Sequence, residues 1–486
     1  MAVETAIATG RLTERSAIEL AAAIRAREVS AREVVEAHIE LLQRVNPRIN
    51  AVIAPRYEAA RDEADAADAR LADSPDPGEL PPLLGVPCTM KESIGFAGMP
   101  NCAGVAARRE HVCDRTATVA RRLTCAGAIP LGLTNLSELT LWVETENRVY
   151  GRTSNPYDPS RTAGGSSGGE GAAIASGGSP IGLGSDLGGS IRLPAFFNGI
   201  FGHKPSPGLV PQTGLYPAAV GVTGELGVCG PLARRAQDLM PVLRIISGPD
   251  GEDPVAEPID LAEPEEVGLD GLRVVIAEGA TLAPTSPELA AARERAAGAL
   301  AAAGARLERI SMRSVRRAME IYLTTLSTAA GVTARELLAD AGAPPLDLRA
   351  ALRRRGPHTV ATRITLIAER LAARAPGWRT RRMMAAGRDF VDELRATIGD
   401  GVLLHPPAPK VAPRHGRTVG RLWWIHPMIV FNLARVPVTQ VPLGLNERGL
   451  PLGVQVAAGF ARDEVAIAVA LELERVFGGW APPSPA

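Results

Sequence analysis

GGSSGGE at residues 164–170 and GSDLGGSIR at residues 184–192 are two glycine- and serine-rich runs separated by GAAIASGGSPIGL. Glycine allows positive φ angles and close approach of the backbone to a ligand. The first run leads into a predicted helix start at 172–175, whose N–H groups favour developing negative charge. The two runs together predict a built site that contains Ser166 and Ser190, because a mere linker would not lead into a second glycine pair.

Lys91, in GVPCTMKE at residues 85–92, adds an amine to the two serines. A serine hydroxyl is a weak nucleophile and needs a base within hydrogen-bond reach. Histidine is the usual base, but lysine serves when it is neutral. Burial lowers a lysine pKa by up to several units from about 10.4, and Met90 and Ile94 provide apolar surroundings. Taken by itself, Lys91 could equally be a lysine on the surface or one that pairs with Glu92. Only the combination indicates a nucleophile, a proton shuttle and a base for acyl transfer.

The second run also offers backbone donors. An oxyanion hole needs N–H groups aimed at the oxygen of a tetrahedral intermediate. Consecutive N–H groups with little side-chain cover are predicted for Leu187, Gly188, Gly189 and Ser190. Asp186 and Arg192 flank this loop, and they either pair to hold it or are ordinary surface charges.

Composition excludes several classes of function. The 486 residues suffice for a large core, and 46% hydrophobic with 22% charged residues is ordinary for a globular protein. A formal net charge of zero gives no global attraction to nucleic acid or to anionic membranes. Five cysteines without a C-x-x-C pair predict reduced thiols, no zinc site and a cytoplasmic protein. We expect neither a signal peptide nor a transmembrane segment.

Short apolar runs alternate with helical patterns and predict an α/β protein. S-x-x-E capping boxes at Ser16 and Ser30 predict two N-terminal helices. Over residues 84–235 the alternation predicts a mixed or parallel sheet covered by helices. We expect a single domain over residues 1–486, with a core at about 60–310 and 426–480 and a helical variable insertion at about 310–425.

Residues 164–203, taken with Lys91, resemble the amidase signature family. The run that continues through IRLP at 191–194 is most similar to the fatty acid amide hydrolase branch. The similarity extends through GHKP at 202–205 and GPLAR at 230–234 and resumes at residues 437–453. It implies the amidase signature fold, an α/β/α sandwich with a central mixed β-sheet covered by helices.

The resemblance also assigns roles. Ser190 is implied to be the nucleophile, Ser166 the shuttle after a cis peptide bond, and Lys91 the base, with no cofactor and no metal. Support is expected from Gly165, Ser167, Asp186 and Arg192. The same resemblance places a segment on the acyl side of the substrate, with Leu136, Leu139, Leu141, Trp142 and Val143, and the pocket is predicted at Leu136, Thr140 and Trp142. Core packing explains these side chains equally well.

The implied reaction is hydrolysis of a small-molecule amide, and of esters and aryl carbamates, through an acyl-enzyme. Aryl carbamates are among the expected substrates because the chain also resembles metagenomic urethanases of this family. Three alternatives are weighed against it. The first is a glutamine-hydrolysing subunit of a tRNA-dependent amidotransferase, against which Glu170 and residues 310–425 count. The second is an α/β-hydrolase nucleophile elbow at Ser166 or Ser167, which requires a later histidine. The third is a non-catalytic binding module. The oligomeric state, monomer or homodimer, stays open.

Overall fold

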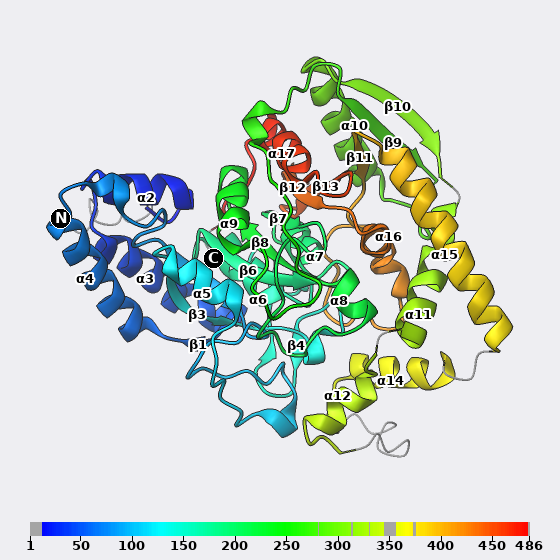
Figure 1. Cartoon of the computed structure of the whole chain (residues 1–486), viewed down its shortest axis with the longest axis horizontal. Helices are drawn as coiled ribbons and strands as arrows, with labels where there is room; N and C mark the ends of the chain where they lie inside the picture. Colours follow the sequence, from blue (N-terminus) through cyan, green and yellow to red (C-terminus); the bar gives the residue numbers. More distant parts are fainter. Residues whose placement is uncertain are drawn as a thin grey trace.

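A mixed sheet of 11 strands forms the centre of the computed structural model (Figure 1). The structure describes residues 12–279, 281–312, 314–329, 331–344, 356–372 and 376–484. The expectation about an N-terminal signal concerns residues 1–11, which lie outside this range. In sheet order the strands are β1 (Val52–Pro55), β3 (Ile129–Thr134), β2 (Pro87–Lys91), β6 (Ile181–Asp186), β8 (Val228–Ala233), β7 (Phe201–Lys204), β12 (Val438–Leu445), β13 (Pro451–Ala458), β11 (Val402–His405), β9 (Arg273–Glu278) and β10 (Arg306–Ser311).

The pairing is parallel at β2 with β3 and β6, and again at β9 with β10 and β11. The other neighbouring pairs in the sheet are antiparallel. The predicted mixed sheet is thereby confirmed. A separate short pair is formed by β4 (Glu146–Asn147) and β5 (Gly151–Arg152).

Helices cover both faces of the sheet. They are α2 (Ala17–Arg25), α3 (Ala31–Ile49), α4 (Tyr57–Asp73), α5 (Thr118–Cys125), α6 (Gly168–Ala175), α7 (Arg192–Phe197), α8 (Val222–Leu226), α9 (Leu239–Ile246), α10 (Pro287–Ala302), α11 (Ala318–Ala329), α12 (Ala334–Asp340), α14 (Val360–Ala372), α15 (Gly377–Ile398), α16 (His426–Ala434) and α17 (Asp463–Phe477). The two predicted capping boxes are present at the starts of α2 and α3.

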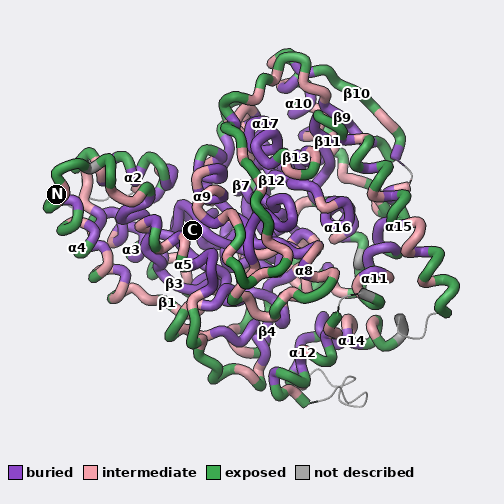
Figure 2. The backbone as a smooth tube through the Cα atoms, viewed as in Figure 1, coloured by how far each residue is buried: buried purple, intermediate pink, exposed green. Residues whose placement is uncertain are grey.

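Alternation along β9 shows how the layers form. Successive side chains of a strand point to opposite faces of its sheet. Val274 and Ile276 pack in the cluster that includes buried side chains of α10 and α17. Val275 and Ala277 pack in the cluster that includes those of α11, α15 and α16. The sheet therefore lies between two helical layers, which confirms the α/β/α sandwich, and Figure 2 shows its strands as mostly buried.

The described residues between 312 and 398 are mostly helical. They contribute α11, α12, α14 and α15, and α15 runs along the outside of the molecule beside α11 and α16 (Figure 1). The chain then returns to the sheet as β11, between β13 and β9. The helical segment therefore ends before residue 402. Within the described residues, no helix is long and apolar enough to cross a membrane.

Candidate active site

Lys91 ends β2, between the parallel neighbours β3 and β6, and its side chain is fully buried. Its Nζ donates to Ser166 Oγ over 2.7 Å and to Ser185 Oγ over 2.8 Å. Burial lowers the pKa of Lys91 to about 7, although the nearby acidic groups Asp186 and Glu170 pull it upward. A substantial fraction of the amine is therefore neutral near pH 7, as a lysine base requires.

Ser166 lies in a turn that is closed by its glycine neighbours. The Gly165–Ser166 peptide bond is cis, as the resemblance implied, and Gly164 has a φ of +82°. A Cβ at Gly165 would lie 2.6 Å from the Trp142 carbonyl oxygen, so only glycine fits this approach. Two residues beyond Ser166, α6 begins at Gly168. The glycines therefore let the turn pack tightly while Ser166 Oγ meets Lys91.

Ser190 follows Gly189, whose φ is +109°, and precedes α7. It lines the same cavity as Ser166 and Ser185. The Ser167 N–H donates to the Ser190 carbonyl over 3.3 Å, which ties the two glycine runs together. The tertiary structure thus brings Lys91, Ser166 and Ser190 to one place.

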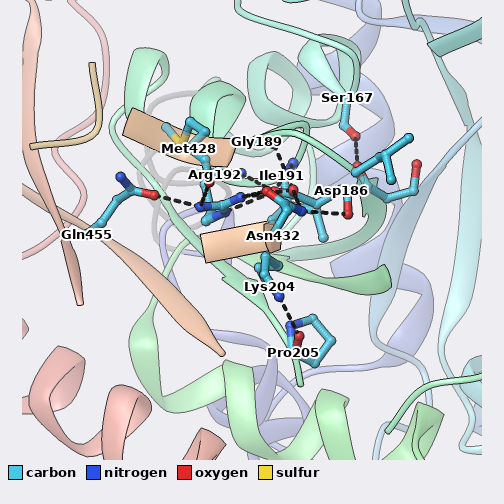
Figure 3. Close-up of polar contacts among 12 residues, drawn as sticks. Ser167, Asp186, Gly189, Ile191, Arg192, Lys204, Pro205, Met428, Asn432 and Gln455 are labelled. Atoms are coloured by element: carbon cyan, nitrogen blue, oxygen red, sulfur yellow. Dashed lines mark hydrogen bonds and ion pairs between the residues drawn. The ribbon is translucent and has the colours of Figure 1, made fainter. Parts of the chain in front are cut away.

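Asp186 and Arg192 pair inside the protein rather than on its surface. Both side chains are fully buried, and Arg192 Nε lies 3.0 Å from Asp186 Oδ2 (Figure 3). Arg192 also donates to Asn432 Oδ1 over 2.6 Å and to Gln455 Oε1 over 2.8 Å. Burial alone would raise the pKa of Asp186, but the Arg192 guanidinium outweighs it and holds that pKa well below its usual range. The pair holds both ends of the loop that carries Ser190.

One predicted oxyanion donor needs correction. The Gly189 N–H donates to Asp186 Oδ1 over 2.7 Å, so it is already occupied (Figure 3). The Ile191 N–H donates to the other carboxylate oxygen over 3.1 Å. Of the predicted set, the N–H groups of Leu187, Gly188 and Ser190 are left as candidates.

The serines open onto a cavity of about 280 Å³. Among the predicted pocket residues, Thr140 lines it, next to Leu139 and Leu141. Leu139 and Thr140 have φ angles of 53° and 60°, so the chain turns sharply at this point. The predictions for Leu136 and Trp142 are not supported by the described lining. Leu136 is fully buried, and the Trp142 indole N–H donates to Thr418 Oγ1 over 3.0 Å.

Most of the remaining lining is apolar and comes from segments distant in sequence. The loop before α8 supplies Leu215, Pro217 and Val220, and helices α11 and α12 supply Leu323, Leu326 and Leu337. No motif marks these side chains, so sequence reasoning missed them. It also missed Ser185, whose only signal is its place beside Asp186 at the end of β6.

Glu138 connects the segment that lines the cavity to the start of α14. Its buried carboxylate accepts hydrogen bonds of 2.8 Å from His358 Nδ1, the Thr359 N–H and Thr362 Oγ1, at the start of α14. Glu138 directly precedes the cavity residues Leu139 and Thr140. Glu138 therefore links the start of α14 to the segment that lines the cavity.

Lys204 is a second fully buried lysine near this network (Figure 3). Its Nζ donates to the Pro205 carbonyl over 3.0 Å. Burial, followed by the positive charge of Arg192, lowers the pKa of Lys204 to about 7. Among the described residues, no group of three or more His, Cys, Asp or Glu side chains is placed to hold a metal ion.

A serine pair, a buried amine and an apolar cavity thus meet at the carboxyl ends of β2 and β6, the arrangement that acyl transfer through a serine requires. The family model described as Amidase matches residues 33–466, and the chain belongs to the amidase signature family.

Several related proteins are similar to this chain over nearly its whole length. Fatty-acid amide hydrolase 2-A of Danio rerio is 39% identical over 98% of this chain and 91% of its own length. Fatty-acid amide hydrolase 2 of Homo sapiens is 40% identical over 96% and 90%. One component of the glutamyl-tRNA(Gln) amidotransferase of Deinococcus radiodurans is 32% identical over 95% and 97%.

Solved structures agree with this assignment. The 6-aminohexanoate cyclic dimer hydrolase in complex with its substrate has a TM-score of 0.82 at 27% identity, covering 97% of this chain and 99% of that one. A bacterial aryl acylamidase of the amidase signature family has a TM-score of 0.82 at 25% identity, covering 95% and 96%. The chain is thus an amidohydrolase by family.

Proposed function

We propose that this protein hydrolyses amides of apolar or aryl acids through a Ser190–Ser166–Lys91 relay, and that it also cleaves esters and aryl carbamates. The observation that carries the proposal is the 2.7 Å hydrogen bond from Lys91 Nζ to Ser166 Oγ, in a buried site that opens with Ser190 onto one cavity. No cofactor takes part in this relay.

In the acylation step, Ser190 Oγ attacks the substrate carbonyl carbon and gives its proton to Ser166. Ser166 passes its own proton to neutral Lys91, which becomes an ammonium. The oxygen of the tetrahedral intermediate accepts hydrogen bonds from the loop N–H groups. The proton then returns through Ser166 to the leaving nitrogen, the C–N bond breaks, and an acyl-Ser190 ester forms. Proton delivery to nitrogen is what lets the site expel an amine.

In the deacylation step, water attacks the ester carbonyl and loses its proton to the relay. The ester bond breaks, Ser190 regains a proton, and the carboxylic acid leaves. An aryl carbamate would react at the same carbonyl: its C–O bond breaks, the alcohol or phenol leaves with the relayed proton, and a carbamoyl-Ser190 forms. Water then releases a carbamic acid, which loses CO₂ to give the amine. The same donors would serve because the developing charge lies on the same oxygen.

The cavity supports an apolar acyl group. Its volume is close to the lower limit of small-molecule sites, roughly 300 Å³, and leucine side chains of five segments line it. The names of the fatty-acid amide hydrolase and aryl acylamidase relatives point to the same kind of substrate.

A substrate panel tests the proposal. Purified protein would be assayed against a 4-nitroanilide series of increasing acyl length, a matched aryl ester and a matched aryl carbamate. Ser190→Ala is the inactivating variant, and Ser176→Ala, after the end of α6 and outside the described cavity lining, is the matched control. We expect turnover that Ser190→Ala abolishes, and an acyl adduct on the peptide containing Ser190 by mass spectrometry. Turnover that survives Ser190→Ala would refute the relay, and absence of carbamate turnover would remove that substrate class alone.

A glutamine-hydrolysing role is the second candidate, because the amidotransferase component of Deinococcus radiodurans is similar over most of the chain. The leucine-rich cavity opposes it, since glutamine is polar and needs partners for its charged groups. Ammonia release from glutamine, measured beside release from an aryl amide, separates the two. Faster turnover of glutamine would favour the amidotransferase role.

A further inference from the structure

Tyr322 contacts the oxyanion loop from outside the glycine motifs. It belongs to α11, in the helical segment that ends before residue 402, and its ring is buried. Its hydroxyl donates to the Leu187 carbonyl oxygen over 3.1 Å. Burial, followed by the negative charge of Asp186, raises the pKa of Tyr322, so the hydroxyl stays protonated and remains a donor.

The contact fixes a whole peptide plane. In a trans peptide the C=O and N–H groups lie in one plane and point in opposite directions. The Leu187 carbonyl faces Tyr322, so the Gly188 N–H of the same peptide faces away from it. Leu187 and Ser190, on either side of the two glycines, line the cavity. Moreover, a hydrogen bond accepted by a carbonyl strengthens the N–H of that peptide as a donor.

Glycine at position 188 fits this arrangement. A Cβ there would lie 2.9 Å from the Tyr322 hydroxyl oxygen, so any side chain would displace that hydroxyl. A Cβ at Gly189 would lie 2.6 Å from Met428 of α16. The loop is thus held by α11 and α16, in addition to the Asp186 carboxylate that accepts from Gly189.

We infer that Tyr322 is a positioning residue for the hydrolytic reaction, because it aims and polarises the Gly188 N–H as an oxyanion donor. The inference rests on the proposed function at Ser190. It gives the helical segment a part in transition-state stabilisation, besides its part in the cavity wall. Tyr322 acts through Gly188 and does not itself touch the reacting atoms.

Tyr322→Phe tests the inference because it removes only the hydroxyl. We expect kcat to fall roughly 10-fold with KM unchanged, since an oxyanion donor acts in the transition state and complete removal of one costs about 100-fold or more. Phenylboronic acid, which forms a tetrahedral adduct on a serine, should bind correspondingly more weakly, while the carboxylic acid product binds as before. A merely structural role would not separate these two ligands.

Tyr157→Phe is the matched control, because Tyr157 is a partly buried tyrosine whose hydroxyl likewise donates to a carbonyl, that of Ala481. It should leave kcat and boronate affinity unchanged. If Tyr322→Phe does not fold, Gly188→Ala supplies the second measurement, since its Cβ displaces the hydroxyl and should lower kcat with KM kept. If both fold, the loss from Gly188→Ala should be smaller in the Tyr322→Phe background.

The outcomes distinguish this inference from the proposed function. Turnover that persists in Ser190→Ala overturns the proposed function and the inference with it. Turnover that depends on Ser190 but is unchanged in Tyr322→Phe, with wild-type boronate affinity, overturns the inference alone. Equal losses of boronate and product affinity would also overturn it, because they would indicate a general disturbance of the site.

Discussion

Lys91 Nζ lies 2.7 Å from Ser166 Oγ, and both side chains are fully buried. An ammonium in such a place would be costly, because burial disfavours the charged form. The hydrogen bond therefore joins a serine to an amine whose pKa lies near neutrality. Ser185 accepts a second hydrogen bond from the same nitrogen and helps to fix its position.

Activity should rise with pH through neutrality. Burial lowers the pKa of Lys91 to about 7. Below that pH the ammonium form cannot accept a proton, and above it the neutral base predominates. This rise is measured as kcat/KM between pH 5.5 and 9, with an aryl amide substrate that does not itself titrate in this range. We call it the ascending limb of the pH profile. We expect an increase with a midpoint near pH 7 and no measurable activity for Lys91→Met. A steady fall above pH 7 in a folded enzyme would contradict a lysine base.

Ser185→Ala should lower kcat about 10-fold, a modest loss for a group that acts through the general base. It should also move the same limb to lower pH. The substitution removes an acceptor for the Lys91 ammonium, and loss of a hydrogen bond to the charged form disfavours that form. Ser185→Thr keeps the hydroxyl and is expected to behave like wild type. A limb that does not move in Ser185→Ala would show that the contact does not influence Lys91.

Arg192→Met should destabilise the fold by about 3–5 kcal/mol, because it leaves the Asp186 carboxylate buried and unpaired. Urea denaturation followed by circular dichroism measures the change. Arg475→Met, at an exposed ion pair with Glu472, is the control and should leave the transition almost unchanged. Similar midpoints for the two variants would argue against a structural role of the buried pair.

The same pair predicts acid lability. The folded pKa of Asp186 is depressed below its unfolded value, which is about 3.9. Its stabilising contribution is therefore complete above the unfolded pKa and is lost as pH falls from there towards the folded pKa. Unfolding free energies measured from pH 6 to pH 2.5 should decline below about pH 4.

Glu138→Gln should loosen the contact between α14 and the cavity. The substitution removes the charge that accepts hydrogen bonds from His358, Thr359 and Thr362. We expect a loss of about 1–3 kcal/mol in unfolding free energy and faster amide exchange in α14. KM should rise more than kcat falls, because Leu139 and Thr140 shape the cavity. Glu336→Gln, at the exposed cap of α12, is the control. Unchanged amide exchange in α14 would show that Glu138 does not hold this helix against the cavity wall.

Leu326→Trp should restrict the enzyme to substrates with short acyl groups. The larger side chain would project into the cavity from α11, so long acyl anilides should lose kcat/KM by at least about 10-fold while acetanilides keep it. Trp142→Phe is the matched control, because Trp142 bonds to Thr418 and is not part of the described lining. A change of acyl preference in Trp142→Phe, but not in Leu326→Trp, would reverse this assignment.

Several features could be predicted from local sequence because local physics fixes them. The capping boxes at Ser16 and Ser30 satisfy N–H groups within one turn and therefore mark helix starts. The glycine runs at 164–170 and 184–192 mark tight turns, because close backbone approach excludes a Cβ. The α/β class and the sheet likewise follow from the alternation of apolar runs with helical patterns, and the family follows from the resemblance of the two glycine runs and Lys91 to known members.

Other features depend on contacts between residues that are remote along the chain. Gly189 as an oxyanion donor was predicted from its glycine neighbours, but Asp186 already occupies its N–H. The whole segment from Leu136 to Val143 was predicted on the acyl side, but only Leu139, Thr140 and Leu141 of it are in the described cavity lining, where two positive φ angles turn the chain sharply.

The sequence by itself determined the turns, the helix starts and the residue types that acyl transfer needs. Only the tertiary structure decided that Lys91 is dehydrated beside Ser166 and that Tyr322 reaches the Leu187 carbonyl. The reason is physical. Propensity and capping act over a few residues, whereas burial and cavity shape depend on the packing of segments that lie far apart in sequence.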